Sequence, residues 1–357
     1  MIKKTVLDWF DKYFGSSEAL LLSIILLASL LIFMTFGGVL GPLLVSIVIT
    51  FLLQGMVNKV CSFGISRSVA MSLSYIVFIV GMISLLVGFI PLVGRQMRVL
   101  VGETPSILAN IQDIIASVPE KYADYVTVDQ FNAISVRVTE ELGEVAEQLF
   151  ALSISSFPGL LSIVIYLILV PLLVFFMLKD KDLLVSFFSG LLPSNRPVLN
   201  SIWLEMEAQC SNYIRGKFIE IILVGFTSLI AFMFLDLKYA ALLAMLVGLS
   251  VLVPYIGATL VTIPVLMVGY AQWGWGPEFL WLSIIYVIIQ FLDGNLLVPL
   301  LFSEVVNLHP VAIISAVLIF GGVWGFWGVF FAIPLATLVN AVYKAWPVSD
   351  MNSAPED

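Results

Sequence analysis

The chain has 357 residues, of which 61% are hydrophobic and only 11% are charged. This composition excludes an ordinary soluble domain and predicts an integral membrane protein, with the lipid bilayer as its first partner. The formal net charge of −8 comes without any basic patch interleaved with aromatic residues, so nucleic acid is not an expected partner.

Six long apolar runs predict membrane-spanning helices. They lie near residues 20–36, 38–57, 68–93, 157–178, 217–235 and 279–302. Each approaches or exceeds the roughly 20 residues that a helix needs to cross a bilayer. None alternates polar and apolar residues as a membrane β-strand does, so we expect helices rather than a barrel. No cleavage pattern follows the first run, which we therefore expect to stay as a span.

Lys and Arg residues are distributed unevenly between the predicted loops. With the amino terminus in the cytoplasm, the loops on the other side carry only Arg95, Arg98, Lys121, Arg137 and Lys238. Because cytoplasmic loops of membrane proteins are enriched in basic residues, this orientation is favoured and both termini are predicted to be cytoplasmic.

Residues 1–93 therefore form three amino-terminal transmembrane helices, and residues 94–156 interrupt the hydrophobic pattern with a polar, acidic segment. Apolar residues recur at helical spacing in this segment, which predicts a small helical extramembrane domain on the periplasmic side. Its apolar stripes pack within the domain or against the membrane, or alternatively form a helical contact between protomers.

Residues 157–214 contain a fourth transmembrane helix followed by a stretch that mixes aromatic and polar residues. Such a stretch is typical of interfacial amphipathic helices at the cytoplasmic surface. Pro193 and Pro197 break it, which predicts two short helices joined by a turn.

Residues 215–346 contain one three-element unit twice, with an offset of about 71 residues. A span is followed by an apolar hairpin in each unit, at 239–272 and at 310–343. An odd number of crossings separates the two units, so they form an inverted repeat. The hairpin arms are either short re-entrant segments whose tips meet near the midplane or full spans, and the sequence leaves both open. Residues 347–357 are expected to be a flexible tail.

Glycines, prolines and aromatic residues gather at the two hairpin tips. The first tip contains Pro254, Tyr255 and Gly257, and the second contains Gly321, Gly322, Trp324 and Gly325. Broken helices at mid-depth expose backbone groups that can bind a polar solute or an ion, which makes these residues candidates for a transport pathway. The alternative is that they are helix-packing glycines and turn prolines.

Gln290, Asp293 and Asn295 place three polar side chains within the last long apolar run. An ionisable residue inside a membrane is costly, so Asp293 is a candidate to carry a proton or coordinate a cation, or else it pairs with a basic residue. Glu220 is expected to pair with Arg215 or Lys217, either structurally or as a gate.

No spacing typical of zinc hydrolases, nucleotide-binding loops or serine hydrolases occurs. We therefore expect neither an enzyme nor a cofactor or metal, and transport would be secondary or passive.

Several short sequence segments resemble motifs of the autoinducer-2 exporter family. They lie at 213–217, 253–258, 290–299, 307–310, 321–328 and 333–334. The resemblance implies an all-α protein of the bacterial inner membrane with eight full transmembrane helices or their equivalent. It also implies an inverted repeat, a homo-oligomer (a pentamer in the family) and elevator-like motion.

Three functions follow as hypotheses. The preferred one is secondary export of a small polar solute such as autoinducer-2, with the hairpin tips as its pathway. The second is sodium/proton antiport, the other activity attributed to the family, with Asp293 as the residue that carries it. The third is a membrane scaffold that does not transport and acts through the acidic domain.

Overall fold

The computed structural model describes residues 13–103, 137, 156–193, 196–254, 256–302 and 308–346, and every regular element within these ranges is a helix. Most of the predicted acidic domain at 94–156 and the predicted tail at 347–357 lie outside the described residues. The all-α class predicted from the apolar runs is confirmed.

In the described part of the chain, eight helical stretches are long and apolar enough to cross a membrane, which is the predicted number. The helices are α2 (Ser17–Phe36), α3 (Gly41–Cys61), α4 (Arg67–Ser84), α7 (Ser156–Lys179), α8 (Lys181–Gly190), α9 (Pro197–Phe234), α10 (Ala240–Ser250), α11 (Ile256–Trp273), α12 (Pro277–Leu292), α13 (Val298–Phe302), α14 (Pro310–Phe330) and α15 (Ala332–Ala345), with π-helical turns η1 (Leu85–Phe89) and η2 (Asp293–Leu297). Helix α4 continues through η1 as far as Glu103, and α12, η2 and α13 form one continuous stretch.

Local sequence explains where several of these helices begin. The Ser16 hydroxyl accepts a hydrogen bond from the backbone N–H of Ala19 at 3.1 Å and caps α2. His309 caps α14 in the same manner, since its Nδ1 accepts from the N–H of Val311 at 3.2 Å, and Pro310 follows at the first helical position. The single histidine of the chain is thus a helix-capping residue.

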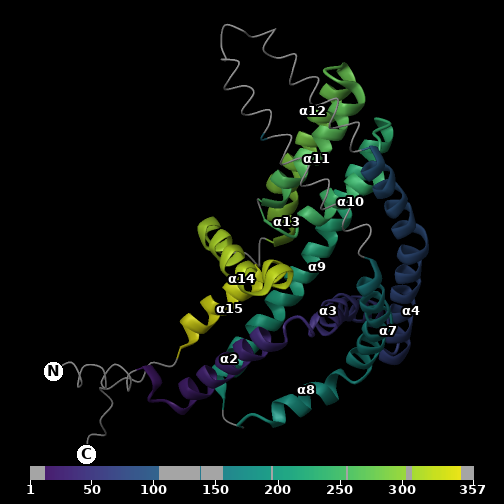
Figure 1. Ribbon diagram of the computed structural model, residues 1–357. Helices are drawn as coiled ribbons and strands as arrows, with labels where there is room; N and C mark the ends of the chain where they lie inside the picture. Colours follow the sequence, from purple (N-terminus) through teal and green to yellow (C-terminus); the bar gives the residue numbers. More distant parts are fainter. Residues whose placement is uncertain are drawn as a thin grey trace, which may run out of the picture.

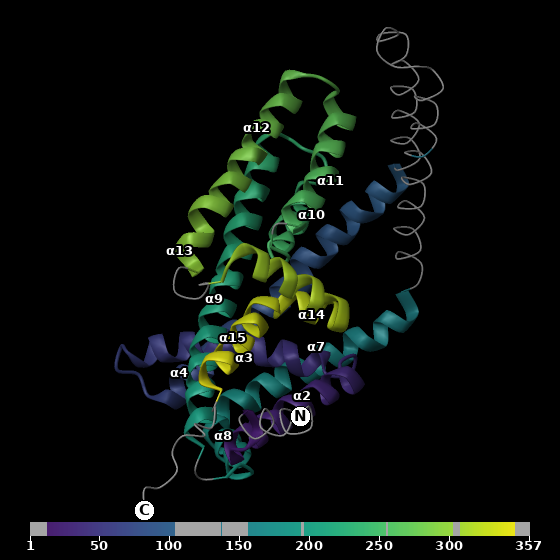
Figure 2. The ribbon, with the colours of Figure 1, turned by 90° about the vertical axis from the view of Figure 1, so that its left-hand side faces the viewer.

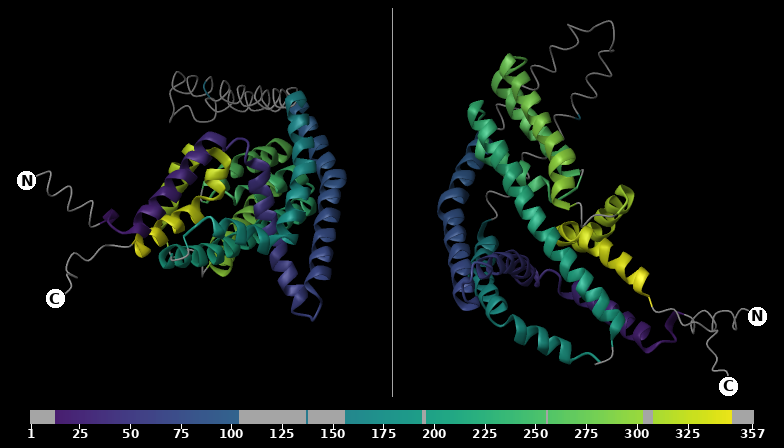
Figure 3. Two further views of the ribbon diagram at one scale, coloured as in Figure 1. Left: turned by 90° about the horizontal axis from the view of Figure 1, so that it is seen from below. Right: turned by 180° about the vertical axis from the view of Figure 1, so that it is seen from behind.

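Helix α9 is the axis of the molecule (Figure 1). It is 38 residues long and packs against α3, α10, α12, α13 and α15. Figure 3 shows it running diagonally through the fold, with α3, α4 and α7 on one side. The second short amphipathic helix predicted before residue 214 is instead the first half of α9. Pro197 starts this helix, and no breaker separates its polar half from its apolar half.

Two hairpins cover the other side of α9 (Figure 2). Helices α10 and α11 form the first hairpin, and α14 and α15 form the second, at the positions predicted from the glycine and proline clusters. Helix α14 is interrupted at Gly325, whose φ of 58° and ψ of −132° are accessible in practice only to glycine.

Apolar clusters join these helices. The largest lies between α9, α10, α11 and α12 and contains Phe232, Leu242, Val265 and Tyr286. A separate cluster joins α3 to α7. In the helical continuation of α4 beyond η1, the side-chain oxygen Oε1 of Gln96 accepts a hydrogen bond from the backbone N–H of Leu242 at 2.8 Å, which ties this segment to the start of α10.

Candidate functional site

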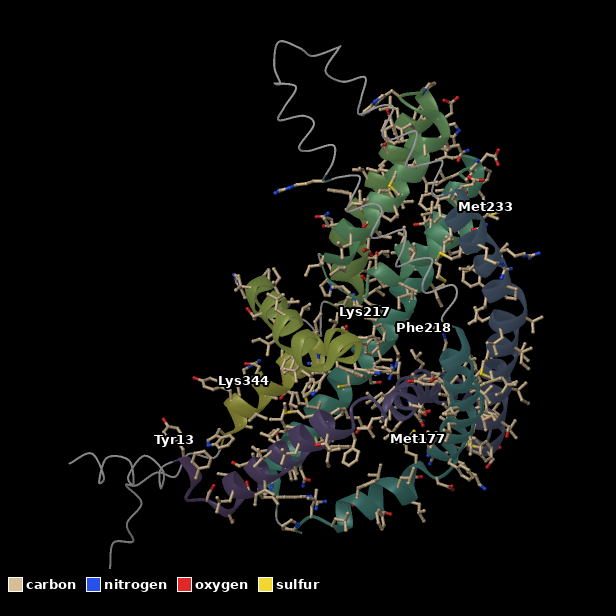
Figure 4. The ribbon with its side chains drawn as sticks, viewed as in Figure 1. Tyr13, Met177, Lys217, Phe218, Met233 and Lys344 are labelled. Atoms are coloured by element: carbon tan, nitrogen blue, oxygen red, sulfur yellow. The ribbon has the colours of Figure 1, made fainter. Side chains whose placement is uncertain are left out.

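A cavity of about 240 Å³ lies where α9, the tip of the first hairpin, η2 and the second hairpin converge. We call it the central cavity. It is lined by Lys217, Glu220, Ser250, Val251, Val253, Pro254, Ala258, Gln290, Asp293, Gly294, Val298, Phe302, Ile313 and Ile333. Figure 4 marks Lys217 at the middle of α9, close to α13 and α14.

Helix α9 contributes an ion pair to the central cavity. The Lys217 ammonium lies 2.8 Å from a Glu220 carboxylate oxygen, and the two residues are only 4% and 1% exposed. Lys217 also donates to the carbonyl oxygen of Val251 at 2.7 Å and lies 5.2 Å from the centre of the Phe302 ring. The ammonium group thus links α9 to the end of α10, where the helical hydrogen-bond ladder leaves carbonyl groups free.

Of the two predicted partners of Glu220, Lys217 forms the ion pair and Arg215 does not. Positions three apart lie on the same face of a helix, whereas positions five apart are rotated by well over a right angle. Arg215 accordingly turns away, is exposed, and donates to the hydroxyl of Ser211.

Asp293 and Gln290 approach the cavity from α12 and η2. Asp293 is 9% exposed and begins the π-helical turn. Its Oδ1 and the Gln290 Nε2 are buried and have no hydrogen-bond partner among the described residues. π-Helical turns inside α-helices are frequent at functional sites, because the extra residue in the turn redirects the side chains. The chain therefore stays helical through this polar segment, as a π-turn.

Asn295 does not reach the central cavity. Its side chain is exposed and donates to the carbonyl oxygen of Phe291 at 2.9 Å. Two positions along a helix turn a side chain to nearly the opposite face, which separates Asn295 from Asp293.

The tip of the first hairpin lines the cavity through Val253 and Pro254, and Tyr255 lies outside the described residues. Gly257 is buried at this tip. A Cβ atom at this position would collide with the carbonyl oxygen of Ser250, so only glycine lets α11 approach the end of α10 this closely.

The second tip differs from the prediction, because Gly321, Gly322, Trp324 and Gly325 do not line the central cavity. The second hairpin contributes Ile313 and Ile333 from its arms. The Trp324 ring stacks on Phe320 with ring centres 5.6 Å apart and also contacts Phe33 of α2. The break at Gly325 thus positions aromatic side chains against α2, away from the cavity.

Lys217, Ser250 and Phe302 line the cavity although the sequence does not single them out as pathway residues. For Lys217 a signal exists, namely the spacing of three residues to Glu220 within an apolar helix. Ser250 and Phe302 carry no such signal, because only the folded chain brings the end of α10 and α13 to the same face of α9.

The site can bind a small molecule through hydrogen bonds and charge. Lysine supplies N–H donors, the two carboxylates supply acceptors, the amide of Gln290 supplies both, and apolar side chains surround these groups. Buried in a mostly apolar helical protein, such groups interact strongly with any polar solute that reaches them.

Comparison with known proteins identifies the family of this chain. A family model described as "AI-2E family transporter" matches residues 21–348. The chain is 44% identical over 342 residues to "Putative permease PerM" of Escherichia coli K12, which covers 96% of this chain and 97% of that protein. It is also 26% identical over 313 residues to "Putative transport protein YueF" of Bacillus subtilis, covering 85% and 82% of the two chains. The chain therefore belongs to the AI-2E transporter family, whose named relatives are permeases and transport proteins.

Proposed function

We propose that this protein is a secondary transporter of the bacterial inner membrane that exports a small polar solute through the central cavity. Autoinducer-2, the solute that gives the family its name, is the proposed substrate. The proposal includes cytoplasmic termini, because the basic residues of the loops concentrate on one side.

The observation that carries the proposal is the group of unpartnered polar atoms inside the membrane-spanning helices. The Asp293 Oδ1 and Gln290 Nε2 atoms are buried without hydrogen-bond partners among the described residues, and both residues line the cavity. A buried polar atom without a partner costs free energy, so it is retained where it serves a ligand. At about 240 Å³ the cavity lies near the lower end of the size range of ligand pockets, which favours a small solute.

The hairpin tips support an inverted repeat as part of the proposal. A Cβ atom at Gly257 in the first hairpin would collide with the carbonyl oxygen of Ser250 at the end of α10. A Cβ atom at Gly328 in the second hairpin would collide with the carbonyl oxygen of Phe320, which precedes the break at Gly325 in α14. The offset of about 71 residues between the two repeat units relates these two glycines to each other. A homo-oligomer with elevator-like motion of the hairpins completes the proposal, as the family resemblance implies.

Cation/proton antiport is the second candidate, and the two carboxylates in the cavity favour it. Asp293 and Glu220 both line the central cavity, and a carboxylate there could exchange a proton for a cation. Lys217 already neutralises Glu220, so Asp293 is the group left to carry this exchange.

Ligand-induced stabilisation tests whether the solute binds at the central cavity. A ligand that binds only the folded protein raises the melting temperature, and the shift grows with the logarithm of the ligand concentration relative to its Kd. We expect autoinducer-2 to raise the Tm of the detergent-purified protein and of Asn295→Ala, whose side chain lies outside the cavity. Asp293→Asn should lose the shift, and a shift that is absent in all three proteins, or equal in all three, would refute binding at this site.

A further inference from the structure

A second cavity, of about 430 Å³, lies between α3, α7, α8 and α9. We call it the lower cavity. It is lined by Ile47, Thr50, Phe51, Gln54, Asn58, Met177, Lys181, Leu184, Val185, Trp203, Met206, Glu207, Cys210, Ser211, Ile214, Arg215 and Phe331. Figure 4 marks Met177 on α7, below Lys217 in that view.

The lower cavity lies where helices leave the membrane. The span in α7 ends at Lys179, and α8 follows at Lys181 with exposed apolar side chains such as Phe187 and Phe188, as in a helix that lies on a membrane surface. Lys181 pairs with Glu207 at 3.5 Å, whereas Arg215 has only the Ser211 hydroxyl as its side-chain partner in the described part of the chain. The charged lining therefore has a net positive charge.

An apolar cluster separates the two cavities. It consists of Tyr213, Ile214, Phe302, Ile313 and Ile333, and we call it the apolar plug. Its members Phe302, Ile313 and Ile333 line the central cavity, whereas its member Ile214 lines the lower cavity. Phe51 and Phe331, which pack against the plug, also line the lower cavity. One cluster thus supplies wall residues to both cavities, with different members facing each.

Specific contacts hold the apolar plug together. The Tyr213 hydroxyl donates to the carbonyl oxygen of Phe330 at 2.9 Å, which joins α9 to the end of α14. The Phe302 ring packs against Gly216, where an added Cβ would lie 2.6 Å from a ring carbon. Phe302 therefore rests directly on the backbone of α9, beside the Lys217 ammonium.

We propose that the lower cavity is the cytoplasmic vestibule of the transport path and that the apolar plug is its closed gate. This inference rests on the proposed function. Solute would pass between the vestibule and the central cavity when Phe302 and the second hairpin move away from α9. The net positive lining around Arg215 favours a neutral or anionic polar solute over a cation.

Thiol labelling tests the vestibule without knowledge of the solute. In Cys61→Ser protein, Cys210 is the only cysteine, and it lines the lower cavity. We expect a membrane-impermeant anionic methanethiosulfonate reagent to modify Cys210 from the cytoplasmic side of inside-out vesicles, and not from the other side. Modification by lipid-soluble N-ethylmaleimide alone would show that lipid fills the cavity and would overturn the proposal.

A reporter in the central cavity tests the plug. Ser250→Cys in a background without Cys61 and Cys210 should react slowly with the impermeant reagent from the cytoplasmic side. Adding Phe302→Ala should raise the rate at least about tenfold, because the truncated side chain no longer packs the closed state. The matched control is Leu300→Ala, because Leu300 lies near Phe302 in sequence but is 70% exposed.

Equal labelling rates with and without Phe302→Ala would contradict the gate. If Phe302→Ala does not give a single peak in size-exclusion chromatography, Ile333→Ala replaces it with the same expectation. Labelling reports access of the reagent to the cysteine and does not require solute transport. If labelling supports the vestibule but no solute flux is found, the proposed function is refuted while the vestibule stands.

Discussion

The ion pair between Lys217 and Glu220 strongly restricts which substitutions the central cavity tolerates. Removing one partner of a buried pair leaves an uncompensated charge, which typically costs about 3–5 kcal/mol. Lys217→Met should therefore lower the thermal stability of the detergent-purified protein strongly and abolish transport. Thermal unfolding followed by intrinsic fluorescence measures the first effect.

The double variant Lys217→Met/Glu220→Met separates stability from function. Apolar replacement of a whole buried ion pair is often neutral or stabilising, so the double variant should recover most of the lost stability. It should not recover transport, because the cavity has lost both charges. A double variant no more stable than Lys217→Met would show that the pair is not what holds α9 in place.

At the residue scale, the cost of burying a polar group is the signal that leads from the sequence to the cavity. Asp293 and Gln290 stand out in an apolar run and both line the cavity. Asn295 stands out equally but faces away, because the register of α12 and η2 decides which polar residue points inward. That register depends on the π-turn, which no local pattern reveals.

At the scale of elements, the two hairpins depend on glycines that allow close backbone approach. Gly257→Ala and Gly328→Ala should each destabilise the protein by about 1–3 kcal/mol, since the added Cβ forces the arms apart. Gly322→Ala is the control, because nothing lies within 4 Å of its added Cβ. Thermal unfolding of the three variants provides the comparison, and a loss of stability equal to that of Gly322→Ala would contradict the role of both tips.

Helix existence and the hairpin positions could be predicted from the sequence, because apolar length and clusters of glycine and proline are local signals. The unbroken α9 could not be predicted, since its polar first half reads as a separate surface helix. The wall of the central cavity could not be predicted either, because its residues come from α9, the end of α10, α13 and α15, which are distant in the sequence.

At the scale of the whole molecule, α9 contributes residues to both cavities and to the apolar plug. It carries the ion pair of the central cavity, the Tyr213 contact of the plug and the Arg215 side of the lower cavity. Movement of the second hairpin against α9 would therefore alter both cavities together. This coupling is the physical basis for alternating access in the proposed transporter.

Solute flux in proteoliposomes measures export through the central cavity. Vesicles loaded with autoinducer-2 and containing the wild-type protein should release it faster than protein-free vesicles, with or without an imposed proton or sodium gradient. Asp293→Asn should slow release at least about tenfold, since a charge-assisted hydrogen bond to the solute is lost. Asn295→Ala should release solute at the wild-type rate.

Two results would contradict the account. Release from wild-type vesicles that never exceeds that from protein-free vesicles would refute export of autoinducer-2 through the central cavity. Sodium-driven proton movement that disappears in Asp293→Asn, without any flux of autoinducer-2, would instead establish the antiporter.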